Sequence, residues 1–140
     1  MVAPLILHAT TIAFDAKAIL LTGASGSGKS SLALQLMAIG ADLVADDRSV
    51  LIRQGDAVVA SCPVTIAGLI EARGVGILQV SYLAQAAVSV VVDLDQLETD
   101  RLPVQRFITI LGQSLTLVLG NKSPHFPAAL KYFVLHGRRG

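Results

Sequence analysis

The residues best suited to chemistry form one short run, from Gly23 to Ser30. The run reads GASGSGKS and matches the pattern G-x-x-x-x-G-K-[ST] at every required position. Glycines adopt backbone angles that side chains forbid, so successive N–H groups can point at one anion. The pattern predicts a nucleotide site in which Lys29 reaches the β- and γ-phosphates and the Ser30 hydroxyl binds Mg²⁺. We expect the phosphates to be bound by Gly23, Ala24, Ser25, Gly26, Ser27, Gly28, Lys29, Ser30 and Ser31.

The residues on either side of this run supply the context that a phosphate-binding loop needs. An apolar segment, Ala18 to Thr22, leads in as a buried strand, and Leu32, Leu36 and Ile39 follow at helical spacing. The positive end of that helix adds to the attraction for phosphate. The alternative interpretation is a glycine-rich turn that contains a lysine by chance. It would not account for the strand before the run or the helix after it.

A phosphate-binding loop does not say what happens to the nucleotide, so a second acidic site must hold Mg²⁺ or accept a proton. Two strand ends compete for this role. Asp46-Asp47 ends the first strand after the predicted helix, and Asp93 ends the β-branched run Val90-Val91-Val92. Adjacent carboxylates repel each other, which suits one Asp as general base and the other as metal support. The alternative for Asp46-Asp47 is an ordinary polar turn.

Composition restricts the classes of protein that can hold this site. The chain has 140 residues, enough for one domain, residues 1–140. Hydrophobic residues make up 53% and charged residues 15%. The longest uncharged segment, Gly74 to Val92, contains Gln79, Ser81 and Gln85, so we reject a membrane helix. A buried parallel or mixed sheet explains the hydropathy better, because its strands are apolar on both faces.

Charge and cysteine usage exclude further classes. A net charge of +1 gives no electrostatic case for binding nucleic acid. Cys62 is the only cysteine, so an intrachain disulfide is impossible and a cytoplasmic location is expected. We expect Cys62 to be a small buried hydrophobe. The segment Met1 to Leu7 is too short for a signal peptide.

Turn residues divide the chain into alternating strands and helices. Ala67 to Gly76 holds three glycines, for which we expect a short helical turn and a glycine-rich loop. In the closing helix we expect Ala129, Leu130 and Phe133 to pack inward. The other expected elements are a strand Leu5 to Phe14 with a turn at Asp15 to Lys17, a helix ending near Gly40, strands Asp42 to Ala45, Ser49 to Arg53, Ala57 to Ser61, Ala87 to Val92 and Leu115 to Val118, and a helix Ala128 to Leu135.

Three segments together resemble the catalytic domain of the bacterial HPr kinase/phosphorylase family. These are the loop Gly23 to Ser30, the strand end Leu43 to Arg48 and the segment Gly68 to Ile77, in which Glu71 and Arg73 stand among small and apolar residues. The resemblance covers roughly residues 5 to 120 and is far more specific than the loop alone. It implies an α/β fold with a P-loop of the phosphoenolpyruvate carboxykinase-like type, a mixed sheet with helices.

The resemblance also implies an activity. Members of the family transfer the γ-phosphate of ATP to a serine of the phosphocarrier protein HPr, remove it again with inorganic phosphate, and are typically hexamers. By position, Asp46 matches the general base and acid, and Asp47 and Glu71 match acidic residues near Mg²⁺. His8 falls where the family has a histidine of the catalytic site, although a histidine on an apolar strand is otherwise a satisfied core residue. Arg73 lies within the matching segment.

This sequence departs from the family in two places. The chain resembles a short form in which the catalytic domain stands alone. The region Gly120 to His125 has no arginine where long members carry an Arg-Asn segment, which leaves phosphorylase activity open, and residues 121–140 have no assigned role. Two other functions remain as rivals: a P-loop kinase of a small metabolite that uses Asp93, and a nucleotide-sensing regulator without phosphotransfer.

Overall fold

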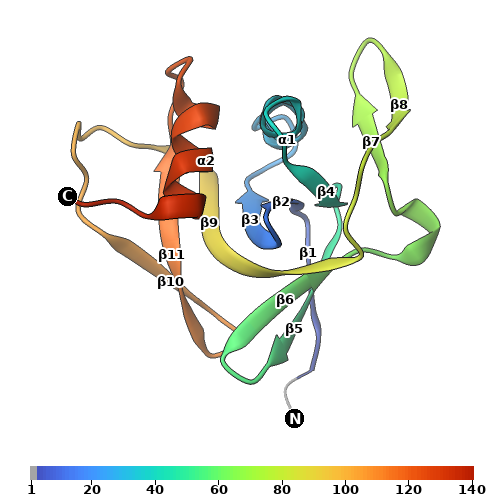
Figure 1. The fold of residues 1–140 in the computed structure, drawn as a ribbon, viewed down its shortest axis with the longest axis horizontal. Coiled ribbons are helices and arrows are strands. Elements are labelled where there is room, and N and C mark those ends of the chain that lie inside the picture. Colours follow the sequence, from blue (N-terminus) through green and yellow to red (C-terminus); the bar gives the residue numbers. More distant parts are fainter. Residues whose placement is uncertain (1–2) are drawn as a thin grey trace.

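A computed structural model describes residues 3–140 as one curled mixed sheet with two helices on one face and a separate hairpin beside them (Figure 1). The strands are β1 (Leu5–Leu7), β2 (Thr10–Phe14), β3 (Lys17–Thr22), β4 (Asp42–Ala45), β5 (Ser49–Gln54), β6 (Ala57–Ser61), β7 (Leu69–Ala72), β8 (Gly76–Gln79), β9 (Gln85–Leu97), β10 (Arg106–Ile110) and β11 (Gln113–Gly120). The helices are α1 (Lys29–Ala38), the 3₁₀ helix η1 (Val64–Ile66) and α2 (Phe126–His136).

The long strand β9 is the centre of the sheet. The strand order is β1-β5-β6-β9-β3-β2-β4, with β11 also paired to β9 and β10 to β11. Strands β3, β9 and β11 run parallel to one another, and the other pairs in this sheet are antiparallel. The carboxyl ends of β3 and β9 therefore meet at one edge, the position where α/β sheets gather ligands.

Both faces of the central strands are buried, which accounts for the high hydropathy of the chain. In β3, Ile19 and Leu21 face the helices, where they pack with Leu36 of α1 and Leu130 of α2. The alternate residue Leu20 points into the curl of the sheet, among side chains such as Val58, Val91 and Leu115. Period-two alternation thus places apolar side chains in two cores rather than one.

Most of the expected elements are confirmed, including the hairpin into the loop, the helix after it, strand β4 and the β5–β6 hairpin. Helix α1 ends where predicted, since Gly40 has φ +113° and its N–H donates to Met37 O at 3.1 Å. Ile39, expected at helical spacing with Leu32 and Leu36, follows the last helical residue and is 36% exposed.

Two expectations about strands and helices need correction. The expected strand from Leu5 to Phe14 is broken, because β1 pairs with β5 whereas β2 pairs with β3 and β4. The segment Ala67 to Gly76 holds no helical turn but most of the β7–β8 hairpin, in which Gly74 and Gly76 take positive φ at the turn. The expected strand Leu115 to Val118 is confirmed as part of β11, which forms a further hairpin with β10.

The closing helix is longer than predicted, and one of the three side chains expected to pack inward does not. Helix α2 packs through Phe126, Leu130 and Val134, with the half-buried Phe133 against the same core, whereas Ala129 is exposed. Neither helix within residues 3–140 has the length and apolar content that a helical membrane crossing requires. Cys62 is half-buried, and desolvation raises the pKa of its thiol, in keeping with an unreactive side chain.

Candidate functional site

The loop between β3 and α1 has the shape of an anion cradle. Gly23, Gly26 and Gly28 have φ of +146°, +81° and +102°, which β-carbons disfavour. A Cβ on Gly23 would lie 2.5 Å from Ser27 Oγ, so the first turn of the loop has no room for a side chain. Ser25, Gly26 and Gly28 of this loop line a cavity of about 610 Å³ at the start of α1, the end of a helix that attracts anions.

Lys29 is held across this loop rather than extended into solvent. Its side chain is buried at 6% exposure, and Nζ donates to Gly23 O at 2.7 Å and to Ala24 O at 3.1 Å. An ammonium group has three N–H donors, so these two contacts leave one for a ligand in the cradle. The Lys29 ammonium group is therefore already positioned at the loop by these two backbone carbonyls.

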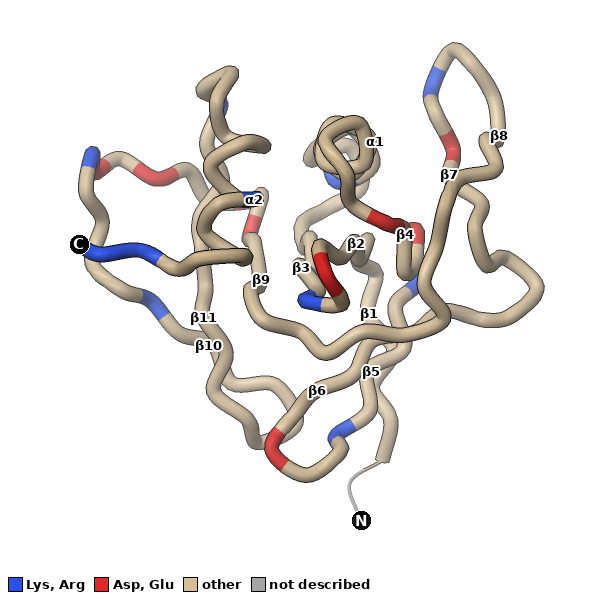
Figure 2. The backbone as a smooth tube through the Cα atoms, viewed as in Figure 1, with Lys and Arg blue, Asp and Glu red and all other residues tan. Residues whose placement is uncertain are grey.

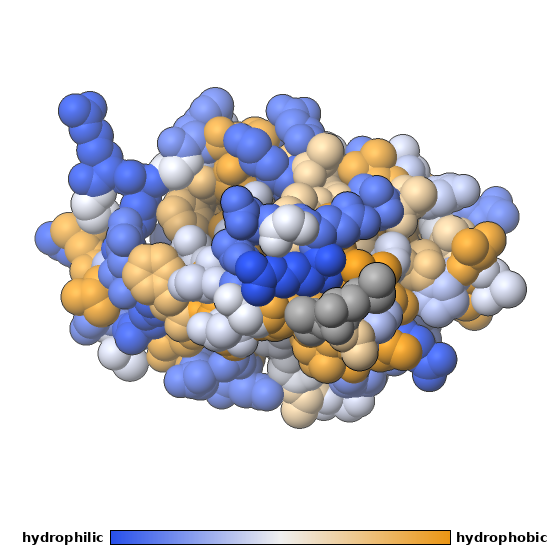
Figure 3. Space-filling view, turned by 90° about the horizontal axis from the view of Figure 1, so that it is seen from below, coloured by the Kyte–Doolittle hydropathy of each residue, from blue (hydrophilic) through white to orange (hydrophobic). Residues whose placement is uncertain are grey.

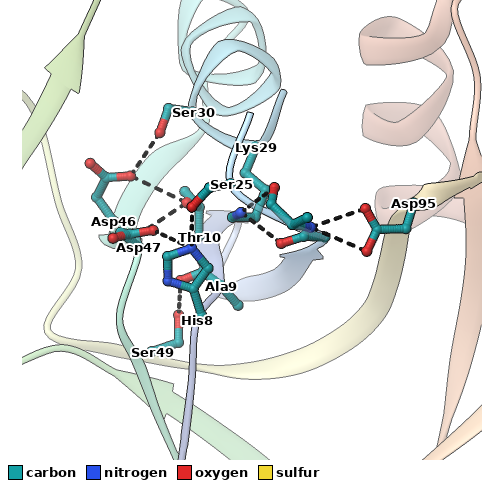
Figure 4. Close-up of polar contacts among 12 residues, drawn as sticks. His8, Ala9, Thr10, Ser25, Lys29, Ser30, Asp46, Asp47, Ser49 and Asp95 are labelled. Atoms are coloured by element: carbon teal, nitrogen blue, oxygen red, sulfur yellow. Dashed lines mark hydrogen bonds and ion pairs between the residues drawn. The ribbon is translucent and has the colours of Figure 1, made fainter. Parts of the chain in front are cut away.

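The carboxylate of Asp46 joins four elements at the end of β4 (Figure 4). Oδ1 accepts a hydrogen bond from Ser30 Oγ of α1 at 3.1 Å and one from Thr10 Oγ1 of β2 at 3.2 Å. Oδ2 accepts from the backbone N–H of Glu71 on β7 at 3.2 Å. Asp46 is thus fixed on three sides and lies beside Ser30, the residue expected from the sequence to bind Mg²⁺.

Asp47 points away from Ser30 and toward His8. The backbone at Asp47 has φ +65°, which turns its side chain out of the line of the strand. Asp47 Oδ1 lies 3.1 Å from His8 Nε2, and the same ring nitrogen lies 3.3 Å from Ser25 Oγ of the loop. Both side chains are exposed, at 64% for Asp47 and 51% for His8, so this pair faces solvent.

A buried hydroxyl pair fixes the backbone beside His8. Ser49 Oγ donates to Ala9 O at 2.8 Å, and Thr11 Oγ1 lies 2.7 Å from Ser49 Oγ, so the threonine is the donor in that second contact. Because the single hydroxyl proton of Ser49 is donated to Ala9 O, Ser49 Oγ can only accept from Thr11. His8, expected to belong to the catalytic site, is therefore placed at the site by the break between β1 and β2.

Glu71 and Arg73 reach the same cavity from the β7–β8 hairpin. Glu71 is an exposed residue of β7, and Arg73 begins the turn at the tip of the hairpin. Figure 2 shows acidic residues at the end of β4 and near the tip of β7, on either side of the space beside α1. The full set that lines the cavity is Ser25, Gly26, Gly28, Lys29, Ser30, Ser31, Leu34, Asp46, Asp47, Glu71, Ala72, Arg73 and Val75.

The donor set suits a hard cation that also binds phosphate. Hydroxyl and carboxylate oxygens are the ligands that Mg²⁺ prefers, and it commonly takes only one or two carboxylates and completes its shell with phosphates and water. Within residues 3–140 no three His, Cys, Asp or Glu side chains come close enough to hold a metal by themselves. Asp46 is the carboxylate that contacts Ser30, and no hydrogen bond links Ser30 to Asp47 or to the Glu71 carboxylate among the described residues.

Two site residues were missed from the sequence. Thr10 orients Asp46 and also accepts from the N–H of Asp47 at 3.2 Å, although a threonine within a β-branched run carries no distinguishing signal. Asp95 accepts from the loop N–H of Ala24, although nothing in its neighbouring residues points to a partner 71 positions away. Asp93, the rival acidic residue, instead accepts from Asp95 N and Gln96 Nε2 and does not line the cavity.

Comparison with known proteins gives consistent matches. The family model of the HPr Serine kinase C-terminal domain matches residues 2–115. The HPr kinase/phosphorylase of Burkholderia lata is 42% identical over 78 residues, which cover 55% of this chain and 24% of the relative, and that of Burkholderia cenocepacia is 41% identical over the same length. The chain thus spans about a quarter of the length of the curated relatives it matches. The structure of the Hpr(Ser) kinase/phosphatase from Coxiella burnetii aligns with a TM-score of 0.78 and 26% identity, covering 94% of each chain.

Proposed function

This chain belongs to the family of the HPr serine kinase C-terminal domain, and from that premise we propose that it is an ATP-dependent protein-serine kinase. Its acceptor is a serine hydroxyl of the phosphocarrier protein HPr or of a paralogue. The observation that carries the proposal is the contact between Ser30 Oγ and Asp46 Oδ1, 3.1 Å long, beside the prepared loop. This contact brings a metal-binding hydroxyl and a carboxylate together where the γ-phosphate of a nucleotide on the loop would lie.

Nucleotide binding is the part of this function that the loop residues perform. Backbone N–H groups of the loop and the positive end of α1 bind the phosphate oxygens, and the remaining donor of Lys29 reaches the β- and γ-phosphates. Ser30 and a carboxylate would hold Mg²⁺, which would supply charge neutralisation on those oxygens. Positioning and electrostatic stabilisation account for most of the rate in phosphoryl transfer.

The acceptor side of the site handles the proton. The serine oxygen forms a bond to the γ-phosphorus as the bond to the β–γ bridging oxygen breaks, and the serine proton passes to Asp46. Asp47 and Glu71 support the metal in this assignment, and His8 orients Asp47. Arg73, at the hairpin tip, neutralises charge on the transferred group. The contact of Asp46 with Ser30 permits the exchanged assignment, in which Asp46 supports the metal and Asp47 takes the proton.

Phosphorolysis by the same residues is the second part of the proposal. In this step an oxygen of inorganic phosphate forms a bond to the phosphorus of phosphoserine as the bond to the serine oxygen breaks, which gives pyrophosphate, and Asp46 returns the proton to the serine oxygen. We further propose a cytoplasmic protein that assembles as a homo-oligomer, a hexamer by analogy with the family. Large apolar side chains such as Val64, Val75 and Ile77 are 91%, 76% and 72% exposed and could be covered by a second copy. On the face seen in Figure 3, apolar and hydrophilic groups are interspersed.

A labelled-phosphate assay tests the proposal. Purified protein is incubated with [γ-³²P]ATP and Mg²⁺, with HPr as acceptor and a panel of small hydroxyl compounds in parallel. Transfer to HPr, abolished when its acceptor serine is replaced by alanine, is the expected result. Transfer to a small compound alone would favour the metabolite kinase, and ATP binding without any transfer would favour the sensing protein.

A further inference from the structure

Strand β9 leaves its ladder where it passes the phosphate-binding loop. Leu119 of β11 pairs with Asp93, yet the next residue, Gly120, pairs with Leu97, so Leu94 to Gln96 bulge out of register. Bulges redirect side chains and are common beside active sites. Asp93 fixes this one, because its Oδ1 accepts from Asp95 N at 2.9 Å and its Oδ2 from Gln96 Nε2 at 2.7 Å.

The bulge directs the carboxylate of Asp95 onto the loop. Its Oδ1 and Oδ2 lie 3.0 and 3.1 Å from the backbone N of Ala24, so both oxygens accept from one N–H (Figure 4). Ala24 is the second residue of the loop, adjacent to Gly23 with its φ of +146°. A glycine at this position lets the peptide between the two residues rotate easily unless something holds it.

The same peptide group also accepts a hydrogen bond from the Lys29 side chain. Its carbonyl is Gly23 O, which accepts from Lys29 Nζ at 2.7 Å, while its N–H donates to Asp95. In a trans peptide the N–H and C=O point in opposite directions, so Asp95 on one side and Lys29 on the other hold the peptide between them. The orientation set by Asp95 therefore places Gly23 O, the nearer of the two carbonyl acceptors of the Lys29 ammonium.

We infer that Asp95 is a positioning residue, which acts through the Gly23–Ala24 peptide to hold the Lys29 ammonium ready for phosphate. The inference rests on the nucleotide site proposed above and adds a residue from β9 to it. Asp95 does not behave as an internal competitor for phosphate. A competing anion would lie on Lys29 Nζ or on the amides at the start of α1, and Asp95 makes no hydrogen bond to either among the described residues.

Two substitutions separate positioning from competition. Asp95→Ala removes both the acceptor and the charge, whereas Asp95→Asn removes the charge but keeps an amide oxygen that accepts from Ala24 N–H. Asp56→Asn, on the β5–β6 turn, is the matched control for loss of one exposed carboxylate. Calorimetry with ATP·Mg²⁺ gives the dissociation constant, and hydrogen exchange of the nucleotide-free protein reports on the loop without any ligand.

We expect Asp95→Ala to raise the Kd for ATP·Mg²⁺ roughly 5- to 10-fold, the size of one charge-assisted hydrogen bond at an exposed site. Exchange protection of Ala24 N–H should fall in the same variant. Asp95→Asn and Asp56→Asn should bind within about 2-fold of wild type, the first because it restores the acceptor.

Each other outcome overturns the inference in a recognisable way. Tighter ATP binding by both Asp95 variants would identify Asp95 as a competing anion. Unchanged binding and unchanged loop exchange in Asp95→Ala would show that the contact positions nothing, with the nucleotide site itself intact. Absence of ATP binding by the wild-type protein would remove the proposed function together with this inference.

Discussion

Asp46→Asn is the substitution that most directly tests the chemistry of the site. The carboxylate accepts from Ser30, Thr10 and the N–H of Glu71, so all its neighbours are donors. Asparagine is nearly the same size, but its NH₂ group is itself a donor and must face one of them. One accepted hydrogen bond is therefore lost along with the ability to take a proton.

The magnitudes follow from these two losses. Proton transfer to a positioned side chain contributes about 10²–10⁴-fold, so phosphorylation of HPr should fall by that factor. One hydrogen bond lost in a partly buried site costs about 1 kcal/mol, which lowers Tm by roughly 4 °C in a domain of this size. ATP affinity should change little, because Lys29 and the loop amides bind the phosphates.

Asp47→Asn is the matched comparison. It lies next in sequence, carries the same change and is exposed, and asparagine tolerates positive φ at least as well as aspartate. Its Tm should equal that of wild type, while activity should require a higher Mg²⁺ concentration. Initial rates with HPr across a Mg²⁺ titration, calorimetry with ATP and thermal unfolding are measured on all three proteins.

The outcome that would refute the reasoning is a wild-type rate of transfer in Asp46→Asn. A different result would exchange the two roles. If Asp46→Asn shifts the Mg²⁺ dependence and Asp47→Asn abolishes transfer without such a shift, then Asp46 supports the metal beside Ser30 and Asp47 takes the proton.

Three further predictions concern the loop and the sheet. Lys29→Ala should raise the Kd for ATP at least about 100-fold, as one desolvated charge contact is worth about 3 kcal/mol, with unchanged circular dichroism; equal affinity by calorimetry would contradict the loop assignment. Gly23→Ala places a Cβ 2.5 Å from Ser27 Oγ at a φ of +146°, so ATP binding should be lost; a wild-type Kd by calorimetry would contradict this prediction. The pKa of Glu98 lies below its ordinary 4.5, chiefly because its carboxylate accepts a hydrogen bond from the Asp100 N–H. Arg106 and the Thr99 N–H lower this pKa further, and desolvation opposes them. Because the pKa of Glu98 is lower in the folded than in the unfolded state, the stabilisation is present above pH 4.5 and is lost as pH falls through the lowered pKa. The difference in Tm between wild type and Glu98→Gln should therefore shrink on acidification. A difference in Tm that does not depend on pH would contradict this assignment.

The sequence by itself determined the local parts of this protein. The loop from Gly23 to Ser30 is recognisable because its chemistry lies in consecutive residues, where glycines permit the backbone angles and the next turn of helix follows at once. The β5–β6 hairpin and the end of α1 were predictable for the same reason, since turn and cap residues act over four or five positions.

The tertiary structure decided which distant residues meet at the loop. Asp46 and Asp47 are adjacent in sequence, yet the positive φ at Asp47 sends one carboxylate to Ser30 and the other to His8. Asp95 reaches Ala24 through a bulge whose register depends on β11, a strand far along the chain. Strand pairing over such separations is set by the packing of two cores against one curled sheet. The pattern of residues in a short segment does not show which distant strand that segment pairs with.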